Sequence, residues 1–239
     1  MAFPTSATFW LEGLTASSVI LVAVITGLIS FYKSRKLKAK LLSYLGLTIF
    51  FIGLLYLGPF TDFMSVLITD INIEVPPFTI GLYGLLSYMW IGPAIVLAMY
   101  IGGELLIPKR KWIIVAVFAL IGVIFEYFLW FHTLETFDFD LPSPGNEVID
   151  SSFVTSYPTF LLMALFIISV LVFNGIGFLI KGIKSTGVLR KKFILLGLGF
   201  LVFTIAGAGD SLVNPDIALV IVRVAMISSI ILMYYGLKT

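Results

Sequence analysis

The sequence predicts an all-α integral membrane protein, a bundle of seven transmembrane helices. Of its 239 residues, 60% are hydrophobic and only 12% are charged, whereas about a quarter of the residues in a soluble domain are charged. The apolar residues fall into seven runs, each close to the roughly 20 residues that a helix needs to cross a bilayer. The composition therefore indicates a single transmembrane domain over residues 1–239, without a soluble domain.

Each predicted helix is bounded by a change of composition. The first run lacks the basic residues that precede a signal peptide core, so we expect it to remain as a helix. A basic segment, 33–40, separates the first run from the second, and the segments 109–111 and 181–192 separate the third from the fourth and the fifth from the sixth. The predicted helices are 11–32, 41–60, 78–100, 112–131, 158–180, 193–213 and 217–237.

The basic residues give the bundle an orientation. Fourteen of the fifteen Lys and Arg residues lie in the three basic segments or at Lys238. The positive-inside rule places such segments in the cytoplasm. The remaining connections carry acidic residues and no basic ones. We therefore predict an N-terminus outside, a C-terminus inside and a location in the cell membrane, with the lipid bilayer as the main partner.

Residues 132–156 form the only long connection of the predicted bundle. They contain five carboxylates, which could attract a cation but lack the spacing of a calcium-binding loop. The stretch 141–145 has the proline and glycine of a turn. We expect a solvated loop here, without a metal site.

The two halves of the chain show a weak internal similarity. It predicts a 3+1+3 arrangement in which the fourth helix lies between two parallel three-helix repeats. Chance similarity between apolar segments is the alternative explanation. The matching positions are Lys40 with Lys192, Gly46 with Gly197 or Gly199, and Asp62 with Asp210.

Charged residues inside the predicted helices form a candidate site. Arg223 lies about 9 Å from the outer end of the seventh helix, at a rise of 1.5 Å per residue. Three carboxylates are predicted at a similar depth, and Glu12 is a further candidate. We predict that Arg223 pairs with Asp210, because only the short connection 214–216 joins their helices. The candidate residues are Asp62, Glu126, Asp210 and Arg223.

This layer of charges has two interpretations. In the first, the carboxylates and the arginine neutralise one another and fix the packing of the helices. In the second, the surplus acid lines an outward-facing polar pocket that binds a proton, a cation or an amine. The sequence leaves both interpretations open.

Aromatic residues of the third helix form a second candidate site. Pro93 removes one backbone hydrogen bond and predicts a kink next to Tyr83, Tyr88 and Trp90. These rings either line an aromatic pocket or pack in the core. The glycine-rich sixth helix favours close helix packing and would also permit a homo-oligomer.

Short motifs resemble a known signalling module. The segments 88–93 (Tyr-Met-Trp-Ile-Gly-Pro) and 100–102 (Tyr-Ile-Gly), followed by a basic loop and Trp112, resemble the third and fourth helices of the seven-transmembrane sensor module found at the N-terminus of many histidine kinases. The resemblance implies a sensor or ligand-binding module without catalytic activity. Such modules feed a cytoplasmic signalling domain, whereas this sequence ends at Thr239, so the resemblance implies a separate cytoplasmic partner at the basic inner face.

Two other classes of protein stay open. A small solute carrier of the seven-helix 3+1+3 type has the same topology. Such carriers typically have prolines inside four helices, and here only Pro93 lies well inside one. A structural subunit of a membrane complex is the other alternative.

The residue types argue against several further classes. Retinal needs a lysine in the middle of the seventh helix, but the lysine there is Lys238 at its end, and an arginine stays protonated and forms no Schiff base. We therefore expect no retinal cofactor. The single histidine, His132, and the absence of cysteine argue against an enzyme and against a metal site. Nothing in the charge pattern indicates nucleic acid.

Overall fold

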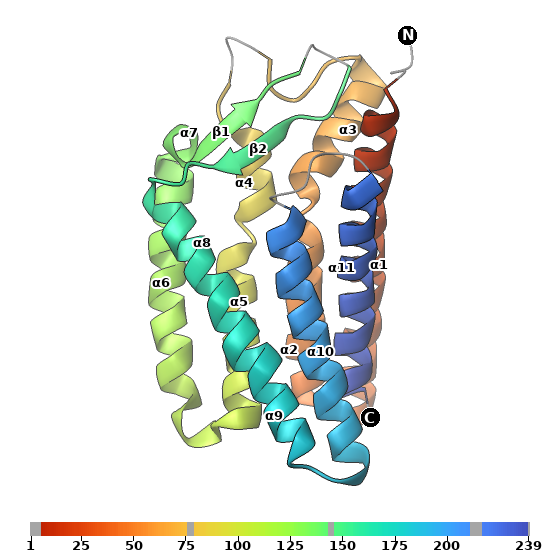
Figure 1. Ribbon diagram of the computed structural model, residues 1–239, viewed down its shortest axis with the longest axis vertical. Helices are drawn as coiled ribbons and strands as arrows, with labels where there is room; N and C mark the ends of the chain where they lie inside the picture. Colours follow the sequence, from red (N-terminus) through yellow and green to blue (C-terminus); the bar gives the residue numbers. More distant parts are fainter. Residues whose placement is uncertain (1–5, 76–78, 143–145, 211–216, 239) are drawn as a thin grey trace.

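The computed structural model describes residues 6–75, 79–142, 146–210 and 217–238. Its long helices run side by side in one elongated bundle, with a small β-hairpin across one end (Figure 1). We call this the hairpin end, and we call the opposite end, where the segments 33–40, 109–111 and 181–192 lie, the basic end. The predicted start of the third helix at residue 78, the turn at 143–145, the end of the sixth helix at 211–213 and the connection 214–216 lie outside the described residues.

Within the described residues, six helical segments are long and apolar enough to cross a membrane, or seven if the bent pair α2–α3 counts as one span. The chain is therefore a multi-pass membrane protein, as predicted. The bend between α2 and α3 measures 46°. The helices are α1 (Ala7–Leu37), α2 (Lys40–Leu54), α3 (Leu57–Thr69), α4 (Leu82–Tyr88), α5 (Ile91–Leu106), η1 (Pro108–Arg110), α6 (Lys111–Phe131), α7 (Thr133–Thr136), α8 (Pro158–Ser169), η2 (Val170–Ile176), α9 (Gly177–Ile183), α10 (Gly187–Asp210) and α11 (Ile217–Leu237).

Two of the predicted helices match the observed limits closely, whereas the second and third, predicted to end at residues 60 and 100, continue to Thr69 in α3 and Leu106 in α5. The seventh predicted helix coincides with α11, and the fourth differs from α6 by one residue. In contrast, α1 continues five residues beyond the predicted limit, and α10 begins six residues earlier. Both extensions contain Lys and Arg, which are good helix formers. Hydropathy therefore marks the apolar part of these helices, while the helices themselves extend beyond it.

Three of the spans are interrupted. Between α4 and α5 the break lies at Met89 and Trp90, next to the kink predicted from Pro93. Pro93 has no amide hydrogen to donate to the carbonyl of Met89, and its ring would clash with that carbonyl in a continuous helix. Between α8 and α9, η2 is a π-helix, in which the buried Asn174 donates through Nδ2 to the carbonyl of Ala98 at 2.8 Å. The pattern of apolar residues gives no sign of this π-helix.

The connection between α6 and α8 is folded, so the prediction of a solvated loop is wrong. It contains α7 and two antiparallel strands, β1 (Phe137–Asp140) and β2 (Asp150–Phe153), with Phe137 opposite Phe153. Both of these rings pack on Tyr88 of α4, with centroid distances of 5.1 and 4.7 Å. The side chain of Ile149, just before β2, is completely buried. Aromatic side chains thus hold this connection onto the bundle.

At the basic end, glycines bring the helices into close contact. A Cβ added at Gly46 of α2 would lie 3.0 Å from the carbonyl oxygen of Gly27 in α1. A Cβ added at Gly199 of α10 would lie 2.8 Å from the amide nitrogen of Met233 in α11. Because these neighbours are backbone atoms, they have little freedom to move aside. Small residues of this kind allow the close helix packing that stabilises membrane bundles.

Candidate functional site

A cavity of about 260 Å³ lies among the helices and below the hairpin. Side chains from α1 to α5, β2, α8, η2, α10 and α11 line it. The upper part of the lining is polar and the deeper part is apolar. The polar residues and tyrosines of the upper part are Glu12, Tyr56, Tyr83, Ser87, Tyr88, Asp150, Ser151, Ser152, Asp210 and Arg223.

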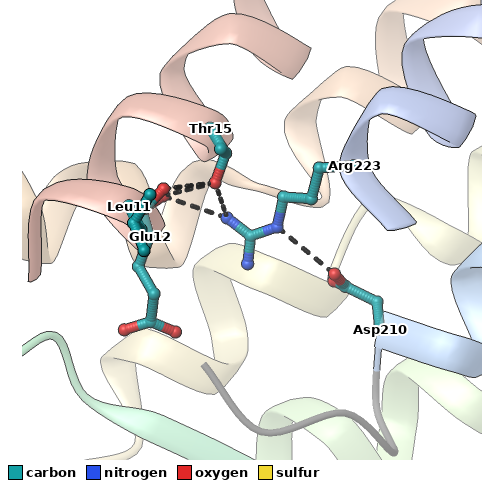
Figure 2. Close-up of polar contacts among 5 residues, drawn as sticks. All are labelled: Leu11, Glu12, Thr15, Asp210 and Arg223. Carbon is teal, nitrogen blue, oxygen red and sulfur yellow. Dashed lines mark hydrogen bonds and ion pairs between the residues drawn. The ribbon is translucent and has the colours of Figure 1, made fainter. Parts of the chain in front are cut away.

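Arg223 is the centre of the polar part. Its side chain is only 5% exposed, and its Nε donates to Oδ1 of Asp210 at 3.2 Å. The pair predicted from the sequence is therefore confirmed. Its Nη1 donates to the backbone oxygen of Glu12 at 3.0 Å and to Oγ1 of Thr15 at 3.2 Å (Figure 2). The guanidinium also lies 4.8 Å from the ring centroid of Tyr56, which is the geometry of a cation–π contact. One side chain thus links α11 to α10, α1 and the bend after α2.

Glu12 contacts Arg223 through its backbone and not through its carboxylate. Arg223 binds its backbone carbonyl, while its carboxylate points away from the guanidinium (Figure 2). That carboxylate makes no hydrogen bond to any described residue, and the side chain lines the cavity. It lies within electrostatic reach of Arg223, Asp150 and Asp210. The cavity therefore contains one closed ion pair and one carboxylate without a direct partner among the described residues.

Asp62 is not part of this cavity, so the predicted layer of four residues is wrong. Its fully buried carboxylate accepts hydrogen bonds from Nδ2 of Asn72 at 2.8 Å and from the amides of Ile73 at 2.8 Å and Ile149 at 2.9 Å. It joins α3 to the segment that leads into β2. Depth along a helix can be calculated from sequence, but the direction of the side chain depends on the bend between α2 and α3.

Glu126 also lies outside the cavity. On α6, its carboxylate accepts from the amide of Gly92 at 3.2 Å and from Nε1 of Trp130 at 3.1 Å. The amide of Gly92 lies just after the break between α4 and α5, where the first turn of α5 has free amide groups. Glu126 therefore stabilises the interruption of this span rather than a pocket.

The predicted aromatic site is confirmed in part. Tyr83 and Tyr88 line the cavity, but Trp90 does not. Trp90 stacks on Phe51 with a centroid distance of 6.0 Å, and its Nε1 donates to the carbonyl of Leu86 at 3.0 Å. Sequence reasoning missed Tyr56, which is 3% exposed at the bend between α2 and α3. Its buried hydroxyl lies close to Asp210 but forms no hydrogen bond of good geometry with it or with another described residue.

The floor of the cavity is apolar. The two threonines that reach it, Thr48 and Thr204, donate their hydroxyls to carbonyls of their own helices, those of Tyr44 and Phe200, at 2.9 Å. They therefore offer little polarity to the cavity. Among the described residues, no three His, Asp or Glu side chains converge in a way that could hold a metal ion. The apolar floor consists mainly of Ile52, Ile91, Ile95, Phe166, Val170, Phe200, Phe203 and Met226.

The sequence matches no protein-family model, and a search of the curated proteins finds no match. The cavity suits a small amphipathic molecule whose polar end lies among the polar residues near the hairpin and whose apolar end reaches the floor.

Proposed function

We propose that this protein is a seven-helix membrane sensor or ligand-binding module that takes a small ligand into the cavity at its hairpin end. The observation that carries the proposal is the Arg223–Asp210 ion pair, which lies in a cavity rather than in packed protein. Charged groups inside membrane spans are costly, and they commonly mark a binding site or a transport path. A purely structural ion pair would need no space beside it.

The proposal includes seven crossings, with the bent pair α2–α3 as one span, an N-terminus outside and a C-terminus inside. The position of the basic segments at one end supports this orientation. The cavity then opens outward. Because the chain has no cysteine, Asp138→Cys in β1 and Thr186→Cys at the basic end can be tested separately in intact cells. An impermeant thiol reagent should label only Asp138→Cys, and labelling of only Thr186→Cys would reverse the orientation.

The 3+1+3 repeat is also part of the proposal. Gly46 of α2 packs on the preceding span, α1, and Gly197 of α10 packs on Leu179 of the preceding span, α9. This similarity supports two related halves. Asp62 and Asp210, which match in the sequence, have different partners, so the two halves would have diverged at the hairpin end.

A sensor would pass the binding event to the basic end. The ion pair ties α10 to α11, and both helices continue without interruption toward the basic end. A ligand that changed the contact of Arg223 with Asp210 would change the packing of these two helices. A separate cytoplasmic signalling protein could read that change at the exposed basic residues near the start of α10, which include Arg190 and Lys191.

A small solute carrier is the second candidate, favoured by the interrupted helices. The bend after α2, the residues on either side of the break between α4 and α5 (Tyr88 and Ile91) and the first residue of η2 all contribute to the lining of the cavity. Discontinuous helices around a central site are typical of secondary transporters. Counter-flow uptake by the purified protein in liposomes separates the two classes, because exchange of a substrate would reject the sensor and establish a carrier.

Binding itself can be tested with a matched pair of variants on α10. Gly207 lines the cavity, and Gly209 does not. A Cβ at either position has room, since the nearest atoms are a terminal methyl of Met226 at 3.3 Å and a methyl of Val222 at 3.6 Å. Small molecules that raise the unfolding temperature of the native protein should lose this effect in Gly207→Leu and keep it in Gly209→Leu. Equal effects in both variants would place binding outside the cavity and reject the proposal.

A further inference from the structure

The charges in the cavity do not cancel. Three carboxylates, those of Glu12, Asp150 and Asp210, share the cavity with one guanidinium. Asp210 already takes the charge of Arg223 through their ion pair, and Asp150 lies at the exposed rim. Glu12 remains as a carboxylate inside the bundle without a hydrogen bond to any described residue. A carboxylate in such surroundings gains most from a cation.

The aromatic groups point to the same chemistry. Tyr56, Tyr83 and Tyr88 surround the polar part of the cavity. The hydroxyl of Tyr56 is buried and has no hydrogen-bond partner among the described residues, so it is available to accept from a donor on a ligand. The faces of tyrosine rings also attract ammonium groups. The tyrosines therefore favour an ammonium group independently of the number of carboxylates in the cavity.

The apolar floor of the cavity determines the chemical character and the size of the rest of the ligand. It consists of aliphatic and aromatic side chains, and its threonine hydroxyls are used within their own helices. With a volume of about 260 Å³, the cavity lies just below the usual range for ligand pockets. The shape and lining therefore fit one ring or a short alkyl chain.

We infer that the ligand is a small organic amine with an apolar body, whose ammonium group is bound by Glu12 beside the tyrosine rings and whose body lies on the apolar floor. This inference rests on the proposed function, since it names the chemistry of the ligand for the same cavity. A carboxylate ligand would instead face the repulsion of Glu12 and Asp150 and would have to compete with Asp210 for Arg223.

A series of three probes with one apolar body tests the inference. Phenethylamine, 2-phenylethanol and 3-phenylpropionate carry a cationic, a neutral and an anionic group on the same ring. Their binding is measured by equilibrium dialysis on the full chain in phosphatidylcholine nanodiscs, with empty nanodiscs to subtract partition into lipid. We expect the amine to bind at least about tenfold more tightly than the alcohol, which corresponds to about 1.4 kcal/mol. The carboxylate should bind most weakly.

The Glu12→Gln variant tests the role of Glu12. Because its carboxylate makes no hydrogen bond to a described residue, this nearly isosteric change should leave the fold intact. We expect it to lower the affinity for phenethylamine about tenfold and to leave the affinity for 2-phenylethanol unchanged. Asp138→Asn, which removes an exposed carboxylate of β1 outside the cavity, is the control and should change neither affinity. Nanodiscs with phosphatidylethanolamine distinguish a free amine from a lipid headgroup, because only a bound lipid amine would compete with phenethylamine.

Different results of these measurements would overturn the amine ligand and the proposed function. Tighter binding of the alcohol or the carboxylate, lost in Gly207→Leu, would overturn the amine and keep the cavity as a ligand site. Binding of the amine that is unchanged in Glu12→Gln would overturn the role of Glu12. Absence of binding by all three probes would reject the inference, while the unfolding comparison of Gly207→Leu with Gly209→Leu would still decide the proposed function.

Discussion

The two ends of the bundle are built by different means. At the basic end, Gly46 and Gly199 bring backbones into contact, and the cationic side chains lie mainly on the surface. At the hairpin end, the helices surround a cavity with an ion pair, and the folded hairpin covers part of it and lines its rim. The same helices, α10 and α11, belong to both regions. The difference indicates that the basic end holds the helices in place, while the hairpin end leaves the space that the proposed function assigns to a ligand.

The largest effect should come from removal of the arginine. Arg223→Met leaves Asp210 without its partner, and loss of one member of a buried ion pair typically costs about 3–5 kcal/mol. We expect a reduction of the free energy of unfolding near this range, measured by denaturation in mixed micelles. Arg35→Met at the basic end removes an exposed arginine and should have little effect. Equal effects of the two variants would remove the distinction between the ends.

The carboxylate of Asp62 should stabilise the segments that cover part of the cavity. Asp62→Ala removes the acceptor for the amides of Ile73 and Ile149, and a hydrogen bond to a charged group contributes about 1.5–3 kcal/mol. Hydrogen exchange should therefore become faster at these two amides while the basic ends of α10 and α11 keep their protection. Uniformly faster exchange along the chain would show that the cover does not open separately. Asp138→Ala, on the exposed face of β1, is the control.

Two glycines of α10 allow the two ends of the bundle to be compared within one helix. In Gly199→Ala the new methyl meets backbone atoms of Met233, and such overpacking costs about 1–3 kcal/mol. In Gly209→Ala the nearest atom is 3.6 Å away, so the gain in helix propensity, up to about 1 kcal/mol, should make the variant as stable as the native protein or slightly more stable. Unfolding in mixed micelles measures both. A greater loss for Gly209→Ala would contradict the description of the two ends.

The smallest effect concerns pH at the hairpin end. The pKa of Glu135 in α7 is lowered because its carboxylate accepts from the hydroxyl of Tyr157 at 2.9 Å and contacts Nδ1 of His132 at 2.7 Å. A lowered pKa means that the stabilisation is present at neutral pH and is lost as the pH falls through the folded-state pKa, below 4.5. Glu135→Gln should flatten this part of the pH dependence of the unfolding temperature. An unchanged profile would show that the contact adds no stability.

The spans and the central ion pair could be predicted from the sequence. Apolar runs determine which segments enter a membrane, and Arg223 and Asp210 flank one short connection, which limits their separation. The positions of Asp62 and Glu126 could not be predicted, because depth along a helix leaves its rotation open and both contacts depend on interrupted spans. Tyr56 was missed because a single tyrosine in an apolar run gives no sign that the helix bends beside it. Phe137 and Phe139 alternate with Asp138 and Asp140, which was the available signal for the folded hairpin.

Because the chain has no cysteine, access to the cavity from the hairpin side can be measured directly. Thr204 of α10 lines the cavity, whereas Ser229 of α11 is completely buried near Gly199 and lies outside its lining. Both side chains are close in size to cysteine. A small, charged, impermeant thiol reagent added from the hairpin side should modify Thr204→Cys and leave Ser229→Cys unmodified. Modification of Ser229→Cys at the same rate, or no modification of Thr204→Cys, would contradict an open cavity at this end.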